Sequence, residues 1–147
     1  MRRIWMIALT VTLLAGALQG KNLSKTPQEK DMKAYLMVYF RDETHSLYMA
    51  LSADGYSFTD VNGGKPVIAG DTISLQKGIR DPHIYRGPDG MFYLAMTDLH
   101  LFAQKAGYRD TEWERDRQEF GWGNNRSMVL MKSKDLINWS RTILRVD

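Results

Sequence analysis

The sequence predicts an all-β fold built from small antiparallel sheets that repeat along the chain. From Ala34 onward, apolar runs of four to seven residues alternate with turn signals, a pattern that favours strands over long helices. The chain has no cysteine, so a packed core rather than disulfide bonds must hold the fold together. Its 147 residues amount to about one average domain.

Seven apolar runs are predicted as strands. Each is short, and each is bounded by residues such as Gly, Pro, Asn and Asp that favour turns. In chain order these runs cover residues 35–40, 47–51, 56–61, 83–86, 91–97, 127–132 and 139–144.

Part of this pattern occurs twice. The motif Ser-x-Asp-x-x-x-aromatic spans residues 52–58 and again 133–139, each time after a predicted strand. Antiparallel repeats of this size suggest β-propeller blades, four-stranded sheets that bury their faces only by stacking on their neighbours. We predict blade repeats at about 34–61 and 79–146, the second with four strands and the first lacking its inner strand.

The missing inner strand leaves an open edge in the first blade, and open edges promote aggregation. In closed propellers the far end of the chain can supply this strand. The sequence stops at Asp147, directly after the second repeat. We therefore expect a partial β-propeller domain over residues 34–147, the N-terminal part of a longer chain.

The first 33 residues precede this fold. Arg2 and Arg3, the apolar run 4–14 and the Ala-Gly-Ala at 15–17 have the order of a secretory signal peptide, predicted over residues 1–17. The apolar run is shorter than the roughly 20 residues of a transmembrane helix, so no membrane span is expected in the mature chain. Residues 18–33 form a polar leader without a period, and the protein is predicted to be secreted or periplasmic.

The charge balance argues against nucleic acid as a partner. Removal of the signal peptide lowers the formal net charge from +3 to +1, and no basic stripe with interleaved aromatic residues occurs. No histidine cluster has metal-ligand spacing, no phosphate-binding glycine loop is present, and no residue argues for calcium. The sequence predicts no cofactor.

A long insertion separates the second and third strands of the second blade. It covers roughly residues 99–125 and holds a charged middle, which suits a short exposed helix, followed by Trp122, Asn125 and Arg126. Loops of this length in compact domains are usually functional or disordered. For Trp122 and Arg126, a core or structural position and a contact with a ligand remain equally open.

Asp81 precedes Pro82 and an apolar strand. Pro82 removes a backbone donor and is expected to restrict Asp81 to extended geometry. In a regular strand, His83 lies on the same side as Asp81. A lone Asp-Pro is more often a strand-start device than a catalytic element, so both interpretations stay open on composition alone.

Two segments carry a resemblance to a known family. The segments 78–98, containing Arg80-Asp-Pro-His-Ile84, and 121–139, ending in Ser133-Lys-Asp-Leu-Ile-Asn-Trp139, resemble the first catalytic blade of glycoside hydrolase family 43. Members of that family are five-bladed β-propeller enzymes that act on arabinose- and xylose-containing polysaccharides. The segment 35–58 is similar to the partial blade that opens some secreted members, so the resemblance spans nearly all of residues 34–146.

The resemblance implies a secreted glycoside hydrolase, an α-L-arabinofuranosidase or β-xylosidase that inverts the anomeric centre. Asp81 matches the general base of the family, while the glutamate acid and a pKa-tuning aspartate match no motif before Asp147. The chain alone is therefore expected to be inactive. Besides Asp81 as catalytic residue, the residues predicted to contact substrate are Arg80, His83, Asp98, Trp122, Asn125 and Arg126.

Three alternatives remain. Families 32 and 68 share the propeller and the Arg-Asp-Pro element but take their nucleophile from an earlier Asn-Asp-Pro-like motif, which this sequence lacks. A non-catalytic carbohydrate-binding propeller would keep the aromatic rim without the acid. A small, complete structural β-domain is the third, and the long insertion and the incomplete first blade count against it. The substrate is an oligo- or polysaccharide in the first two cases.

Overall fold

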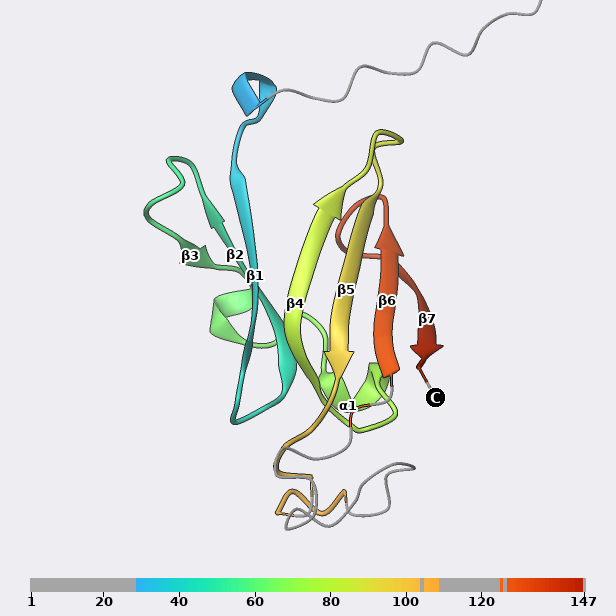
Figure 1. Ribbon diagram of the computed structural model, residues 1–147. Helices are drawn as coiled ribbons and strands as arrows, with labels where there is room; N and C mark the ends of the chain where they lie inside the picture. The colour runs from blue at the N-terminus through green and yellow to red at the C-terminus, as the bar shows by residue number, and fades with distance from the viewer. Residues whose placement is uncertain (1–28, 104, 109–124, 126, 147) are drawn as a thin grey trace, which may run out of the picture.

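The structure, a computed structural model, describes residues 29–103, 105–108, 125 and 127–146 (Figure 1). The predicted signal peptide, residues 1–17, and most of the leader lie outside the described residues. The end of the leader forms a short 3-10 helix, η1 (Glu29–Asp31), which the sequence did not predict. No helix among the described residues has the length and apolar character needed to cross a membrane.

The all-β prediction is confirmed, because the described chain contains seven strands and, besides them, only short helical turns of three or four residues. Two sheets result, both antiparallel throughout, one with the strand order β1-β2-β3 and one with the order β4-β5-β6-β7. We call them the first blade and the second blade. The strands are β1 (Tyr35–Arg41), β2 (Ser46–Ser52), β3 (Thr59–Asp60), β4 (Ile79–Arg86), β5 (Phe92–Asp98), β6 (Ser127–Ser133) and β7 (Trp139–Arg145).

The two sheets have the strand counts that the repeat predicts, three and four. The Ser-x-Asp motif follows β2 in the first blade and β6 in the second. These strands are therefore equivalent, and β1 corresponds to β5. No strand of the described chain takes the place beside β1 that β4 takes beside β5, so the first blade has three strands, as predicted.

The repeated motif forms the same turn in both blades. The hydroxyl of Ser52 donates to Asp54 and accepts the backbone N–H groups of residues 54 and 55, while Asp54 accepts those of residues 56 and 57. All five hydrogen bonds recur around Ser133 and Asp135 at the same offsets. The residue after the aspartate has a positive φ in both copies, 79° at Gly55 and 65° at Leu136.

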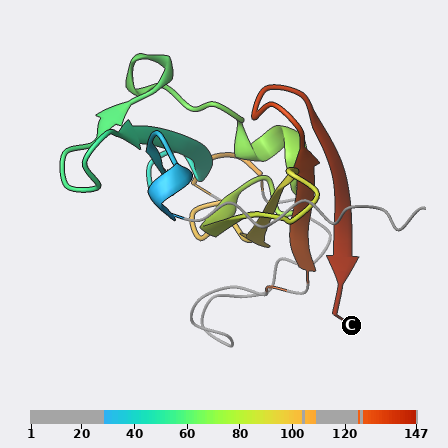
Figure 2. The same ribbon diagram turned by 90° about the horizontal axis from the view of Figure 1, so that it is seen from above.

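The core lies between the two blades. Alternate residues of each sheet point toward it, as the period of two in a strand requires. Figures 1 and 2 show the sheets side by side, with β1 facing β4. The buried apolar cluster draws on both blades and consists of Leu47, Met49, Ile73, Ile79, Leu94, Met96, Val129 and Met131.

Three details differ from the sequence prediction. β3 has only two residues, where a run over 56–61 was expected. β4 begins at Ile79 rather than at residue 83, so Asp81 lies inside the strand and not ahead of it. The connection between the blades contains a short 3-10 helix, η2 (Asn62–Gly64), and a single helical turn, α1 (Gly70–Ile73), neither of which was predicted.

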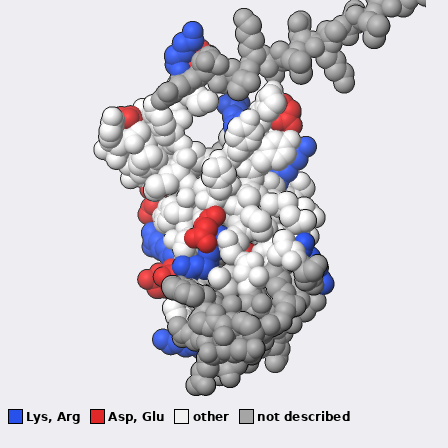
Figure 3. All heavy atoms as spheres, viewed as in Figure 1, with Lys and Arg blue, Asp and Glu red and all other residues white. Residues whose placement is uncertain are grey.

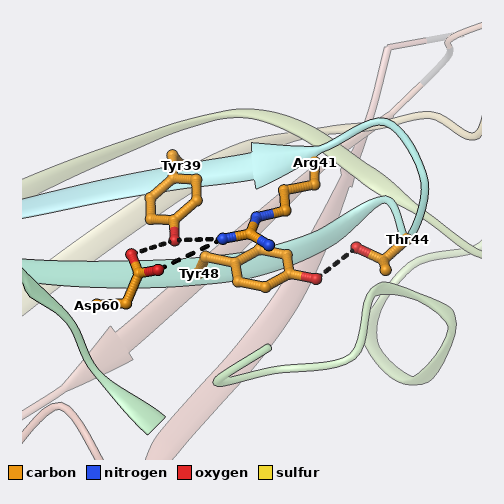
Figure 4. A network of polar contacts seen from close by, with 5 residues as sticks. All are labelled: Tyr39, Arg41, Thr44, Tyr48 and Asp60. Atoms are coloured by element: carbon orange, nitrogen blue, oxygen red, sulfur yellow. Dashed lines mark hydrogen bonds and ion pairs between the residues drawn. The ribbon is translucent and has the colours of Figure 1, made fainter. Parts of the chain in front are cut away.

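A polar network links the short β3 to β1 and β2 of the first blade (Figure 4). The hydroxyl of Tyr39 donates to Oδ1 of Asp60 at 2.6 Å, and the Arg41 guanidinium lies 3.4 Å from Oδ2. Arg41 also lies over the ring of Tyr48, 4.7 Å from its centroid, and Tyr48 shares a hydrogen bond with Thr44. Partial burial, followed by the hydrogen bond to Asp60, raises the pKa of Tyr39. These side chains supplement the two residue pairs that join β3 to β2.

Candidate active site

The candidate site lies at one end of the two sheets, the lower end in Figure 1, where β4 begins. The turn between β1 and β2, residues 42–45, lies at the same end. So does segment 99–108, the described beginning of the insertion that separates β5 from β6. Loops from both blades therefore surround the start of β4.

Asp81 sits in a β-bulge. Arg80 pairs with Thr97 and His83 pairs with Ala95, so Asp81 and Pro82 together oppose a single residue of β5. The backbone of Asp81 is left-handed, with φ at +50°. The expectation of extended geometry before Pro82 is therefore wrong, because the register imposed by β5 outweighs the local preference.

The carboxylate of Asp81 is exposed to solvent. Thr97 donates a hydrogen bond to its Oδ2 at 3.4 Å, which is long for a hydroxyl donor. An ionised carboxylate has about four lone-pair positions, and a single long contact leaves most of them accessible. The geometry thus leaves Asp81 able to accept a proton from a bound water.

His83 is also exposed. The bulge interrupts the alternation of side chains between the two faces of β4, so His83 need not lie on the same face as Asp81. Thr97 and Ala95 lie two residues apart on β5, so their partners Arg80 and His83 share one face of the sheet. The sequence predicts His83 on the same side as Asp81 only if the strand is regular, and the bulge makes this strand irregular. That His83 contacts substrate stays a prediction.

Arg80 joins the two blades. Its guanidinium forms an ion pair with Asp42 in the β1–β2 turn and lies over the ring of Phe40, 4.4 Å from the centroid. The Arg80 side chain is only 16% exposed, whereas that of Asp42 is 59% exposed. Arg80 is therefore largely committed to contacts within the protein, and the prediction that it binds substrate stays a prediction.

Asp98 at the end of β5 is completely buried. Its carboxylate accepts the backbone N–H groups of Leu75 at 2.9 Å and Gln76 at 2.8 Å, and the Ser127 hydroxyl at 2.7 Å. These donors come from the segment before β4 and from the start of β6. Asp98 thus holds three parts of the second blade together at the base of the insertion.

The remaining predicted contacts lie around the insertion. Asn125 is exposed, and its side-chain amide donates to the backbone carbonyl of Asp98 at 3.2 Å. Trp122 and Arg126 lie outside the described residues, as does the charged segment predicted as a short helix. The structure therefore brings Asp98 and Asn125 together.

A cavity of about 550 Å³ opens beside this end of the sheets. Its described lining comes from the β1–β2 turn and from the beginning of the insertion, and consists of Asp42, Glu43, His100, Phe102, Lys105 and Ala106. Asp81 is not among these residues, but the ion pair between Asp42 and Arg80 connects the cavity wall to the residue next to it. None of these six residues is indicated by the sequence, because only the fold brings the two segments together.

The described surface carries charges of both signs. Figure 3 shows acidic and basic side chains interspersed on the face it presents. Among the described residues, no group of three or more His, Cys, Asp or Glu side chains is arranged to hold a metal ion.

Comparison with known proteins gives one match. A family profile described as a probable glycosyl hydrolase domain, related to glycoside hydrolase family 43, matches residues 30–146. No curated protein and no solved structure matched the chain. The matched range contains every described strand and both copies of the repeated turn.

Proposed function

This chain belongs to the glycosyl hydrolase domain family related to glycoside hydrolase family 43, and from that premise we propose that it cleaves arabinofuranosyl or xylosyl linkages of plant polysaccharides. The proposed mechanism inverts the anomeric centre, with Asp81 as general base. One observation carries the assignment. The carboxylate of Asp81 is exposed, and its one hydrogen bond within the described chain is a long one from Thr97, near the start of β4 where loops of both blades meet.

The chemistry requires two carboxyl groups with opposite tasks. Asp81 takes a proton from a water molecule, and the water oxygen attacks the anomeric carbon from the face opposite the leaving group. A carboxylic acid roughly 6.5 to 9.5 Å from the base gives its proton to the glycosidic oxygen as the carbon–oxygen bond breaks. Of this pair, only the base is assigned to a residue, Asp81.

The neighbours of Asp81 divide into two groups in this proposal. His83 is exposed beside the bulge and is proposed to contact the sugar, as are Trp122 and Arg126 of the insertion. Arg80 acts as a positioning residue through Asp42. Asp98 and Asn125 support the loop that carries the insertion, because both form hydrogen bonds to other parts of the protein; that they also contact substrate stays a prediction.

Secretion is part of the proposal and rests on residues 1–17 alone. N-terminal sequencing of the protein from the source or an export-competent host tests it. Cleavage after Ala17 supports export. Recovery of the intact N-terminus from the cytoplasm contradicts it.

The function is tested with the full-length protein and the Asp81→Asn variant on aryl α-L-arabinofuranosides and aryl β-xylosides. Loss of a general base lowers kcat/KM by about 100-fold or more, whereas a drop of less than about tenfold is too small for that role. Asp89→Asn is the matched control, since it removes another exposed carboxylate at the opposite end of β4. Proton NMR of the first product formed shows whether the anomeric configuration inverts.

Binding without hydrolysis would favour the non-catalytic alternative. A wild-type protein that binds these oligosaccharides but releases no sugar from them is a carbohydrate-binding propeller. Release of fructose from a fructan, with no activity on arabinosides or xylosides, would instead favour a relative of families 32 and 68.

A further inference from the structure

Thr97 is held firmly in the sheet beside Asp81. It lies near the end of β5, and it pairs with Arg80 of β4 on one side and with Met128 of β6 on the other. Strand pairing on both sides fixes its backbone, and the branched Cβ of threonine restricts its χ1 angle. The Thr97 hydroxyl is therefore an almost fixed point next to the proposed base.

The side chain of Asp81 has few other contacts to orient it. Its backbone is set by the bulge, with φ at +50°, but the carboxylate itself is exposed. Among the described residues this carboxylate takes part in no ion pair, and the hydroxyl of Thr97, 3.4 Å from Oδ2, is its one hydrogen-bond donor. An exposed side chain without a partner distributes over several staggered rotamers. The hydroxyl of Thr97 therefore selects which of them Asp81 adopts.

The same contact determines the side of the sheet to which the carboxylate turns. Ala95 and Thr97 are two residues apart on β5, so their side chains share one face, and His83 lies opposite Ala95 on that face. The bulge by itself does not direct the carboxylate there. The hydrogen bond from Thr97 brings Oδ2 to the face that carries His83, the residue proposed to contact the sugar.

The single contact leaves the rest of the carboxylate available for chemistry. Oδ2 is held by Thr97, whereas Oδ1 accepts no hydrogen bond from the described chain and is able to accept one from a water molecule. Catalytic hydrogen bonds are often long without substrate and shorten when it binds. Because a misplacement of about 1 Å can cost about 100-fold in rate, a donor that fixes one oxygen also matters for the oxygen that takes the proton.

We propose that Thr97 is a positioning residue for the general base Asp81. Its hydroxyl holds Oδ2, so that Oδ1 faces the water that attacks the anomeric carbon. Thr97 acts through Asp81 and does not itself contact the sugar, so its loss lowers kcat and leaves KM unchanged. This inference rests on the proposed function and adds a second residue to the same site.

A purely structural role for Thr97 leads to a different expectation. Valine has nearly the shape of threonine, forms strands at least as well and lacks the hydroxyl. A half-buried strand residue that serves only packing would therefore tolerate Thr97→Val without loss of activity. Serine keeps the hydroxyl and lacks only a methyl group. The comparison of Thr97→Val with Thr97→Ser thus isolates the hydrogen bond.

The kinetic test uses both variants of the full-length protein on aryl α-L-arabinofuranosides and aryl β-xylosides. Thr97→Val is expected to lower kcat at least about fivefold while KM changes less than about twofold, and Thr97→Ser is expected to keep kcat within about threefold of wild type. Thr142→Val is the matched control with wild-type kinetics, because Thr142 is an exposed threonine of β7 on the same face of the sheet. A smaller loss of kcat in Thr97→Val, or an equal loss in both Thr97 variants, would overturn the inference.

A measurement without turnover separates this inference from the proposed function. Three-bond NMR couplings of the Asp81 carboxyl carbon to its own backbone nitrogen and carbonyl carbon report the χ1 angle. Wild type and Thr97→Ser are expected to show the couplings of one dominant rotamer, and Thr97→Val those of an average over several. This result supports the orienting role of Thr97 even if the wild-type protein releases no sugar, which would contradict the proposed function alone. Identical couplings in wild type and Thr97→Val would refute the role even if Asp81 is essential for activity.

Discussion

The backbone N–H of Leu101 donates to Nε2 of the buried His45 at 3.2 Å. A ring nitrogen that accepts a hydrogen bond carries no proton, so the imidazole is neutral in this arrangement. Burial is the largest cause that lowers the pKa of His45, to about 4, and the positive charges of His100 and Arg80 add to it. This contact joins the β1–β2 turn to the beginning of the insertion.

We predict that the protein loses stability as the pH falls from about 6.5 toward 4. In the unfolded chain His45 binds a proton near its ordinary pKa of 6.5, whereas in the folded protein it does so only near 4. The unfolded state therefore gains a proton first, and the free energy of unfolding decreases across this window. Urea unfolding followed at several pH values between 7.5 and 4 measures the decrease.

The variant His45→Gln separates this residue from other titrating groups. Glutamine retains an acceptor for Leu101 and does not titrate, so the pH dependence between 6.5 and 4 becomes shallower. His83→Gln is the matched control, because it removes an exposed histidine of β4. An identical pH profile for wild type and His45→Gln would show that His45 does not contribute.

Asp81→Gly should stabilise the protein while it removes the proposed activity. A non-glycine residue at φ +50° costs of the order of 1 kcal/mol, which glycine does not incur, so we expect a gain of about 0.5 to 1 kcal/mol. His83→Gly, at a regularly paired position of the same strand, should instead cost about 0.5 to 1 kcal/mol. The denaturant midpoints of the two variants measure these changes in stability. A loss of stability in Asp81→Gly equal to that in His83→Gly would rule out strain at the bulge.

Asp98→Asn should destabilise the protein by about 1 to 3 kcal/mol. The amide keeps one acceptor oxygen and turns an N–H₂ group toward backbone donors, so at least one buried donor at Leu75, Gln76 or Ser127 loses its partner. Thermal or urea unfolding measures the loss, with Asp89→Asn as an exposed control. Unchanged stability combined with a raised KM would support the prediction that Asp98 contacts substrate.

Ser52→Ala and Ser133→Ala should cost similar amounts of stability, about 1 to 3 kcal/mol each. Both hydroxyls are buried, and each accepts two backbone N–H groups that alanine leaves without an acceptor. Ser57→Ala, on an exposed residue of the same turn, is expected to stay within about 0.5 kcal/mol. A marked loss at only one of the two serines would show that the two turns are not equivalent in energy.

The strands and the repeat could be predicted because their signals are local. Alternation of buried and exposed residues in β5 and β6 follows directly from the sequence, and the Ser-x-Asp turn needs only residues within three positions of the serine. The strand count of each blade followed from these same patterns. The sequence predicts too long a β3, because apolar residues near a turn look the same whether or not they pair with a neighbouring strand.

The geometry of the site depends on pairing between distant segments, which one sequence does not specify. The bulge at Asp81 is a consequence of the register between β4 and β5, and Pro82 alone indicated the wrong conformation. The partner of Arg80 lies 38 residues earlier in the chain, in a turn whose acidic residues look like ordinary solvated surface. The sequence places Asp98 at the edge of the insertion, but nothing in it indicates that the carboxylate is fully buried.

The twin Ser-x-Asp turns also bear on how the chain folds. Each closes through bonds that span at most three residues, so it forms without waiting for the rest of the protein. In the second blade it leads straight into the seven residue pairs between β6 and β7, whose alignment it fixes. We expect this hairpin to gain amide protection in the earliest phase of refolding, ahead of the contacts between blades, because short loops close fastest. Pulse-labelled hydrogen exchange would reveal the order, and late protection of β7 would mean that the blades must meet before either turn persists.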